Sequence, residues 1–394
     1  MPHDIAIAGF TPAQRWRSLV AVIASVFGVG VAVGALVPLM SIVLEARGVG
    51  TVLIGVNSAM LPLAVLLVTP FLPRVAARLG TMASMLLALA VTVVAVLLLP
   101  IFPQLWAWFV LRFVIGAAMA MQWLVSETWM NLVATERTRG TVMGAYATVL
   151  AGGFALGPVL LQVTGTEGIL PFVAAAAALA SSALPLALGI GIAPPLVLHR
   201  ARSMLQILWV APVALAAALA GGLTDAGIFV LLPLYGLRLG LPESTSVLLL
   251  TSFAAGTLAL QVPIGWIADR TSRLPVLTIC AAVGVAGAIL LPFALGHPVL
   301  LWPLLFIWGG TVFGLYTVGL SLLAQSVPAS QFALANGAFI MIYELGSLTG
   351  PVIGGAAMDL VGPQGMPAMV GAASLAFLLV AFFAPSPRSA QPAD

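Results

Sequence analysis

A succession of apolar segments constrains the fold of this chain more than any other feature of its sequence. Segments of about 20 residues or more follow one another with short polar breaks, and this is the length that a helix needs to cross a bilayer. Of the 394 residues, 62% are hydrophobic and 6% are charged. Soluble domains carry about 25% charged residues. The pattern predicts an all-α, polytopic membrane protein and excludes a soluble globular domain.

We predict twelve membrane-spanning helices and no soluble domain between them. The predicted spans are residues 17–44, 51–72, 79–100, 104–131, 140–163, 169–193, 206–236, 244–267, 274–294, 298–326, 332–358 and 365–384. The chain then divides into an N-terminal six-helix bundle (1–193), a short cytoplasmic linker (194–205) and a C-terminal six-helix bundle (206–394).

The arginines predict the orientation of the spans. The sequence contains no lysine, so every basic residue is an arginine. If the N-terminus is cytoplasmic, only Arg47 and Arg238 fall in loops on the outer side. The loops and termini on the cytoplasmic side then contain Arg15, Arg17, Arg74, Arg78, Arg137, Arg139, Arg200, Arg202, Arg270, Arg273 and Arg388. The positive-inside rule therefore predicts a multi-pass protein of the cytoplasmic (inner) membrane with both termini cytoplasmic, and the net charge of +3 gives no indication of nucleic-acid binding.

The two halves of the chain repeat each other at an offset of about 193 residues. A Gly-x-x-x-Gly-Pro pattern occurs in the fifth span at Gly153, Gly157 and Pro158, and again in the eleventh at Gly346, Gly350 and Pro351. Glycines at this spacing let helices approach closely, so we expect these residues to serve helix packing. Two halves with the same orientation imply a two-fold axis along the membrane normal and a substrate path between the halves.

The most polar short run is residues 265–273, which we predict to be a tight turn between the eighth and ninth spans. Its residues Gly265, Asp269, Arg270 and Arg273 resemble the Gly-x-x-x-Asp-Arg-x-x-Arg signature of the major facilitator superfamily. A degraded copy at 73–80 keeps Arg78. Residues 111–116 are similar to the arginine motif of that family's fourth span, and residues 346–355 to a motif often seen in its antiporters, where the complete copy normally lies in the fifth span.

The resemblance covers essentially the whole chain and implies two pseudo-symmetric six-helix bundles that work by alternating access. It also implies a cytoplasmic gate whose salt bridges form when the transporter opens outward and break when it opens inward. The gate candidates are Glu127, Glu136, Arg137, Arg139, Arg78, Gly265, Asp269, Arg270 and Arg273. Asp269 would contact the N-terminus of the fifth span near Gly140, where the helix dipole favours an anion. The alternative is a set of solvated loops that merely obeys the positive-inside rule.

Few charged residues fall inside predicted spans, where each costs about 2.5–3.5 kcal/mol on insertion scales and so needs a partner or a function. They are Arg112, Glu127, Asp225 and Glu344, with Asp359 at the margin of the eleventh span. Arg112 either lines the substrate cavity, where it binds an anionic group or holds an acid ionised, or braces the fold by bonding carbonyls of the first span. Glu344 is the first candidate for a protonatable coupling site and Asp225 is the second. For both carboxyl groups, the alternative is a neutral acid bonded permanently to a neighbouring helix.

Trp123, Tyr146 and Tyr343 are candidate cavity residues that could instead pack between helices. The single cysteine, Cys280, lies in an apolar segment, and the three histidines fall at a terminus or in loops. Since no phosphate loop or catalytic constellation occurs, the sequence predicts no metal site, no cofactor, no ATP-driven transport and no enzyme.

These features together predict a secondary active transporter that moves a small organic solute. Proton coupling is expected because a few buried carboxyl groups and one arginine suffice for it, and efflux of amphipathic compounds is slightly favoured. Proton-coupled or facilitated import of a nutrient, vitamin or organic anion is the alternative. A receptor or scaffold that kept the fold without transporting is the rival from another class. The expected partners are the substrate, protons and the lipid bilayer, with the chain acting as a monomer and binding no nucleic acid.

Overall fold

The computed structural model describes residues 11–135, 138–194, 211–327 and 332–383, and within these ranges it contains helices and connecting turns but no strand. The N-terminal bundle comprises α2 (Pro12–Ala46), α3 (Thr51–Val68), α4 (Leu72–Leu79), α5 (Thr81–Leu98), α6 (Leu105–Val133), α7 (Arg139–Thr164), α8 (Leu170–Ser181), α9 (Ala183–Leu186) and η1 (Ala187–Gly189). The C-terminal bundle comprises α10 (Pro212–Arg238), α11 (Glu243–Arg270), α12 (Arg273–Ala294), α13 (Pro298–Ser326), α14 (Phe332–Val361) and α15 (Gly365–Phe383).

Among the described residues, 12 helices are long and apolar enough to span a membrane, which confirms the predicted count. The sixth span, Leu170–Gly189, is built from α8, α9 and η1 together. The short helix α4 follows α3, burying Leu72 and Ala76 while Arg78 is exposed. Most of the linker predicted at 194–205 lies outside the described residues.

Local sequence explains where the first helix begins. Thr11 caps α2 because its hydroxyl accepts a bond from the Gln14 amide, while the Gln14 side chain accepts one from the Thr11 amide. Pro12 stands at the first helical position, where its missing N–H is not needed. The helix therefore begins five residues before the predicted start of the first span at residue 17.

The tight turn predicted at 265–273 is much shorter than expected. Residues from Gly265 to Arg270 are helical and end α11, and α12 begins at Arg273, so only Thr271 and Ser272 connect the two helices. The guanidinium carbon of Arg270 lies 4.0 Å from the centroid of the Trp266 ring. This cation–π contact, one turn apart on the same helix, stabilises the positive charge at the end of the span.

Glycine contacts show that the internal repeat places equivalent helices together. A Cβ atom added at Gly157 of α7 would lie 2.1 Å from the carbonyl carbon of Gly34 in α2. At the equivalent Gly350 of α14, it would lie 2.1 Å from the carbonyl oxygen of Leu223 in α10. Larger side chains would force these helices apart, so α7 packs on α2 in the way that α14 packs on α10.

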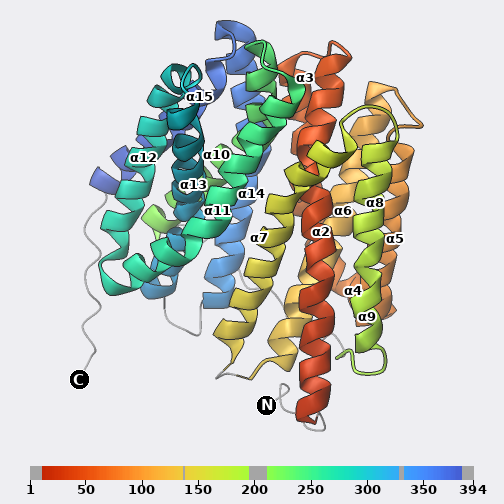
Figure 1. Ribbon diagram of the computed structural model, residues 1–394. Coiled ribbons are helices and arrows are strands. Elements are labelled where there is room, and N and C mark those ends of the chain that lie inside the picture. The colour runs from red at the N-terminus through yellow and green to blue at the C-terminus, as the bar shows by residue number, and fades with distance from the viewer. Residues whose placement is uncertain (1–10, 136–137, 195–210, 328–331, 384–394) are drawn as a thin grey trace, which may run out of the picture.

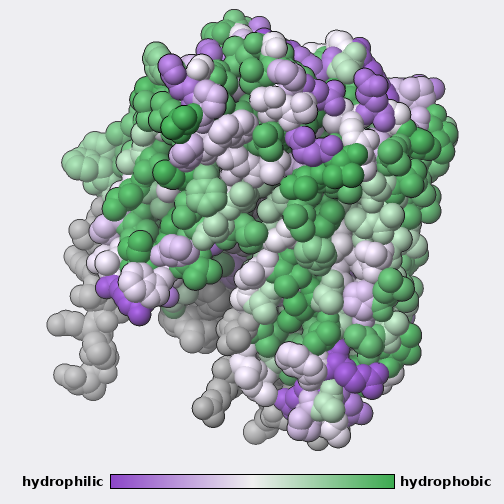
Figure 2. Space-filling view, in the orientation of Figure 1, coloured by the Kyte–Doolittle hydropathy of each residue, from purple (hydrophilic) through white to green (hydrophobic). Residues whose placement is uncertain are grey.

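The two bundles lie side by side, α2–α9 on the right and α10–α15 on the left in Figure 1. The side of the molecule at which α2 begins is called the N-terminal side below, and the other is called the opposite side. Helices α3 and α14, α7 and α11, and α2 and α10 make the contacts between bundles. The outer surface of the bundles is largely apolar in Figure 2, with polar residues gathered at the two ends, as expected of a protein surrounded by lipid.

The bundles are closed on the opposite side and separated on the N-terminal side. Within the described ranges, hydrogen bonds join the two bundles on the opposite side, for example from Gln162 to Ser244 and from Arg238 to Glu45. Figure 2 shows the corresponding hollow between the bundles in the lower half of the view. The molecule is therefore open toward the side at which α2 begins.

Candidate functional site

Two of the predicted coupling residues lie together in the C-terminal bundle. Asp225, in the middle of α10, accepts a hydrogen bond from the hydroxyl of Tyr343 on α14, with 2.8 Å between the oxygens. The second carboxyl oxygen of Asp225 is buried and has no hydrogen-bond partner within the described part of the chain. Glu344 follows Tyr343 directly and is half-buried. The close contact of α10 with α14, where Gly222 meets the carbonyl of Tyr343, brings these residues to one place.

The N-terminal bundle contributes a second group of polar residues from α6 and α7. The hydroxyls of Ser126 and Tyr146 are 3.0 Å apart, and Tyr146 is close enough to Glu127 for electrostatic interaction. Trp123 lies one turn before Glu127 and is half-buried, with an indole N–H that is not hydrogen-bonded to any described residue. The predicted cavity residues Trp123 and Tyr146 therefore lie beside Glu127, which was predicted for the gate.

Tyr316 of α13 connects these two groups across the space between the bundles. It interacts electrostatically with Glu127 of the N-terminal bundle and with Glu344 of the C-terminal bundle. Its ring packs against the rings of Tyr343 at 4.9 Å, Phe339 at 5.4 Å and Phe313 at 5.5 Å between centroids. These four rings form what we call the aromatic cluster (Phe313, Tyr316, Phe339 and Tyr343), and acidic groups from both bundles lie within electrostatic range of it.

The structure does not bring Arg112 to this place. Its side chain is 3% exposed and lies within the N-terminal bundle, where one guanidinium nitrogen is 3.3 Å from Asn57 Oδ1 and 3.5 Å from Met40 Sδ. In the first span, Arg112 therefore contacts the sulfur atom of Met40, whereas the alternative in which Arg112 braces the fold predicted bonds to backbone carbonyls. Beside Arg112 is a cavity of ≈ 20 Å³ lined otherwise by apolar side chains of α2, α3 and α6. Such a volume holds about one water-sized species and cannot hold an organic substrate.

Two of the predicted gate residues, Asp269 and Arg273, pair with each other on the N-terminal side. Asp269 is 68% exposed and pairs with Arg273 at 3.3 Å, and the Arg273 Nε donates to Ser321 Oγ of α13 at 2.6 Å. A Cβ atom added at Gly265 would meet nothing within 4 Å, so the face of α11 that carries Gly265 is open. Glu136, Arg137 and the side chain of Arg139 lie outside the described residues. Within the described residues, Asp269 contacts Arg273 of its own bundle, so this contact does not join the two bundles.

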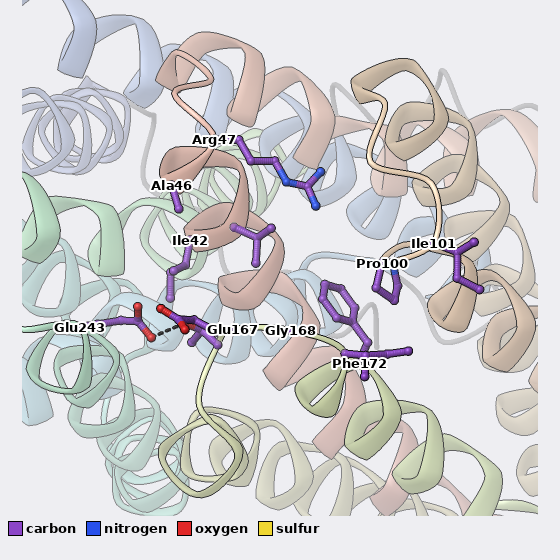
Figure 3. A pocket seen from close by; sticks show the side chains of 12 residues that line it. Ile42, Ala46, Arg47, Pro100, Ile101, Glu167, Gly168, Phe172 and Glu243 are labelled. Atoms are coloured by element: carbon purple, nitrogen blue, oxygen red, sulfur yellow. Dashed lines mark hydrogen bonds between the residues drawn. The ribbon is translucent and has the colours of Figure 1, made fainter.

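A surface pocket lies on the opposite side, away from the aromatic cluster. It has a volume of ≈ 460 Å³ and is lined by residues of α2, the α5–α6 and α7–α8 connections and the start of α11. Figure 3 shows Glu167 and Glu243 on one wall, with the guanidinium of Arg47 pointing away from both. That guanidinium donates to the carbonyl of Pro103 at 3.0 Å and lies 4.5 Å from the ring centroid of Trp108. This pocket flanks the closed contact between the bundles and is separate from the candidate site.

The chain matches the sequence profile of the Major Facilitator Superfamily over residues 20–316 and again over residues 215–394. It belongs to this superfamily of membrane transporters. This agrees with the resemblance found in the sequence and with the twelve spans in two pseudo-symmetric bundles.

Similar proteins and structures extend over most of the chain. The uncharacterised MFS-type transporter YfkF of Bacillus subtilis is 25% identical over 337 residues, 83% of this chain and 85% of that protein. The uncharacterised MFS-type transporter YcaD of Escherichia fergusonii is 29% identical over 307 residues, 77% of this chain and 79% of its own.

Two solved structures share the fold at lower identity. A bacterial homologue of the human lysosomal transporter Spinster, in an inward-facing and occupied conformation, has a TM-score of 0.79 and 13% identity, covering 98% of this chain and 100% of that one. A mutant of the nucleoside transporter NupG has a TM-score of 0.75 and 14% identity, covering 94% and 99%.

Sequence reasoning missed several polar residues that the structure places inside the bundles. Gln122 is 2% exposed, and both polar atoms of its amide are without a hydrogen bond to any described residue. Asn57 is fully buried and accepts a bond from Arg112. Both are amides within apolar segments, so a search for every polar residue inside a predicted span would have found them. A search restricted to charges did not.

Proposed function

We propose that this member of the superfamily is a secondary active transporter that couples the efflux of a small amphipathic compound to the entry of protons across the cytoplasmic membrane. The observation that carries the proposal is that Tyr316 of α13, in the aromatic cluster, is within electrostatic range of both Glu127 and Glu344, which belong to different bundles. A group that interacts with both bundles experiences a different environment when the bundles move, and this is what coupling requires.

The composition of the site supports a substrate with an apolar body and a neutral or positive charge. Aromatic rings bind apolar groups and attract cations through their faces, and the carboxyl groups around them add to that attraction. Arg112, the basic residue predicted to bind an anionic substrate, is enclosed in the N-terminal bundle away from the aromatic cluster. Efflux of amphipathic compounds is therefore favoured over import of an organic anion.

Alternating access follows from the arrangement of the bundles. With the N-terminal side in the cytoplasm, the described conformation is open inward, and Asp269 is exposed there. When the bundles close on that side, Asp269 would reach the N-terminus of α7, as the family resemblance implies. Protons that bind the carboxyl groups from outside would then be released inside.

The test is a flux measurement on the purified protein in liposomes that contain a pH-sensitive dye. Cationic amphipathic compounds, organic anions and vitamins are added in turn, and the expected result is proton movement with the first group. Glu344→Gln should abolish the response, whereas Glu167→Gln, which removes an exposed carboxyl group on the opposite surface, should not change it. Proton movement with anions in the import direction would replace this proposal by the import alternative. Substrate binding without any proton movement would contradict coupling and favour a uniporter or a receptor.

A further inference from the structure

A network of charged residues joins the two bundles on the opposite side. Arg238, the last residue of α10, donates from Nε to Oε1 of Glu45 at 2.8 Å and from Nη1 to Oδ1 of Asp359 at 3.3 Å. Glu45 lies at the end of α2 in the N-terminal bundle, and Asp359 lies near the end of α14 in the C-terminal bundle. The arginine therefore connects an acid of its own bundle with an acid of the other.

Asp359 also crosses to the N-terminal bundle, where it caps α3. Its two carboxyl oxygens accept bonds from the backbone amides of Thr51 at 3.3 Å and Val52 at 3.1 Å, and one also accepts a bond from the Thr51 hydroxyl. The N-cap residue of α3 is Gly50, which has no side chain to supply this bond. The start of α3 is thus satisfied by a carboxylate of the other bundle, where the helix dipole favours an anion. We call this contact the α3–α14 arm.

A second contact joins α11 to the end of α7 and is called the α7–α11 arm. The Thr166 hydroxyl donates to the carboxylate of Glu243, the first residue of α11. One turn earlier, the side-chain amide of Gln162 donates to the carbonyl of Ser244 at 2.7 Å. In each arm, a hydroxyl donates to a carboxylate at the start of a helix. In the α3–α14 arm that helix is α3 of the N-terminal bundle, and in the α7–α11 arm it is α11 of the C-terminal bundle.

The internal repeat relates the two arms to each other. Glu45 and Arg238 are 193 residues apart, the same offset that relates Gly153 to Gly346, so this ion pair joins equivalent positions of the two halves. Two residues that occupy equivalent positions and also touch must lie at the pseudo-two-fold axis.

The same offset relates the members of the two arms. Thr166 is equivalent to Asp359, and Gln162 is equivalent to Gly355. A Cβ atom added at Gly355 would lie 2.4 Å from the carbonyl oxygen of Thr51. Gln162 therefore contacts the start of α11 through a side-chain hydrogen bond to the Ser244 carbonyl. Gly355 contacts the equivalent position of α3, Thr51, through backbone atoms.

We propose that Arg238, at the centre of these two arms, is the gate residue that holds the transporter closed on the opposite side. One oxygen of Glu45 accepts from Arg238, and the other is buried without a hydrogen bond to any described residue. Without Arg238, the closed state would hold Glu45 and Asp359 near each other with no cation between them. Opening would separate the two acids and expose them to water, where an unpaired charge costs little. Loss of the arginine therefore favours the state open on the opposite side.

The inference rests on the proposed alternating access, but its test requires neither a substrate nor transport. Hydrogen–deuterium exchange is measured on the full chain in lipid nanodiscs for the wild type, Arg238→Gln and Arg238→Lys. In Arg238→Gln, exchange should become about tenfold faster at the start of α3 and at the end of α14. It should slow at residues 142–150 of α7 and 335–345 of α14, because the N-terminal side closes when the opposite side opens. Arg238→Lys should restore most of the wild-type pattern.

Two further variants serve as a positive and a negative control. Asp359→Asn weakens both the cap of α3 and the link to Arg238, so it should produce the same pair of changes. Glu167→Gln removes a carboxyl group on the same surface and should alter neither. If Arg238→Gln speeds exchange at the start of α3 or the end of α14 without slowing it on the N-terminal side, the network is a local cap and the gate proposal is wrong. Unchanged exchange at all four segments would overturn it as well, whatever the flux measurements show.

Discussion

Gly55 of α3 offers a direct way to shift the balance between the two conformations. A Cβ atom at this position would lie 2.3 Å from the carbonyl oxygen of Pro351 and 2.9 Å from the Cα of Val352, both on α14 in the other bundle. These are backbone atoms, so no side chain can rotate away to make room. In Gly55→Ala, the added methyl group can be accommodated only if α14 moves away from α3, as it does when the opposite side opens.

The size of the effect follows from the cost of overpacking. Adding a methyl group to a closely packed contact costs about 1–3 kcal/mol. Here the closed state bears this cost and the open state does not, so the ratio of open to closed molecules should rise by about 5- to 150-fold.

The two states can be separated by the distance between spin labels on the N-terminal side. Gly144→Cys on α7 and Met341→Cys on α14 provide the labelling sites in a Cys280→Ser background, since Cys280 is the one cysteine of the chain. A Cβ atom at Gly144 meets nothing within 4 Å, and Met341 is 46% exposed, so both positions accept a label. Electron–electron double resonance should show a shorter distance gaining population in Gly55→Ala.

Gly116→Ala is the matched control for this experiment. Its added methyl group would lie 2.6 Å from the carbonyl oxygen of Leu61, but α6 and α3 belong to the same bundle. This substitution should lower the melting temperature and leave the ratio of the two distances unchanged. If Gly55→Ala also lowers the melting temperature and does not change the distances, then the α3–α14 contact is fixed packing, and the reasoning about a moving interface is refuted.

Two further predictions concern the polar residues inside the bundles. Asn57→Leu removes a hydrogen-bond acceptor from the buried guanidinium of Arg112 and should cost about 1–3 kcal/mol of stability in thermal unfolding, while the double variant with Arg112→Met should recover most of the loss. No recovery would mean that Arg112 is stabilised by other groups. Tyr343→Phe removes the 2.8 Å hydrogen bond to Asp225, worth about 1.5–3 kcal/mol if that carboxyl group is charged, and should reduce the proton signal in liposomes at least about tenfold. Tyr146→Phe should keep most of the signal, and equal loss in both variants would contradict a special role for the Asp225 bond.

The fold could be predicted closely because apolar length and helix ends are local properties of the sequence. The tenth span was predicted at 298–326, and α13 runs from Pro298 to Ser326. A proline at the first position and a polar residue at the end mark these limits. The end of α11 was not predicted, because Arg270 and Trp266 stabilise each other only once they are on one helix. A polar run was therefore interpreted as a turn although most of it is helical.

The candidate site was harder to predict because depth along a helix does not fix rotation about its axis. The depth of Arg112 within the fourth span could be estimated from the sequence, but whether its side chain faced the cavity or the bundle could not. Asp225 and Tyr343 were both singled out, yet their hydrogen bond joins residues 118 positions apart and depends on how α10 packs against α14. The repeat indicates which helices are equivalent, but the rotation of each helix about its axis and the contacts of its side chains follow only from the structure.

The cap of α3 by Asp359 has a consequence for the synthesis of the chain. The bonded residues Thr51 and Asp359 are 308 positions apart, so the start of α3 leaves the ribosome long before its partner has been made. At about 5–20 residues per second, the delay is roughly 15–60 seconds. During that time the first turn of α3 has only water to satisfy its amides. The N-terminal bundle can therefore be inserted early, but the start of α3 gains its cap only when α14 has joined the membrane and the bundles have docked.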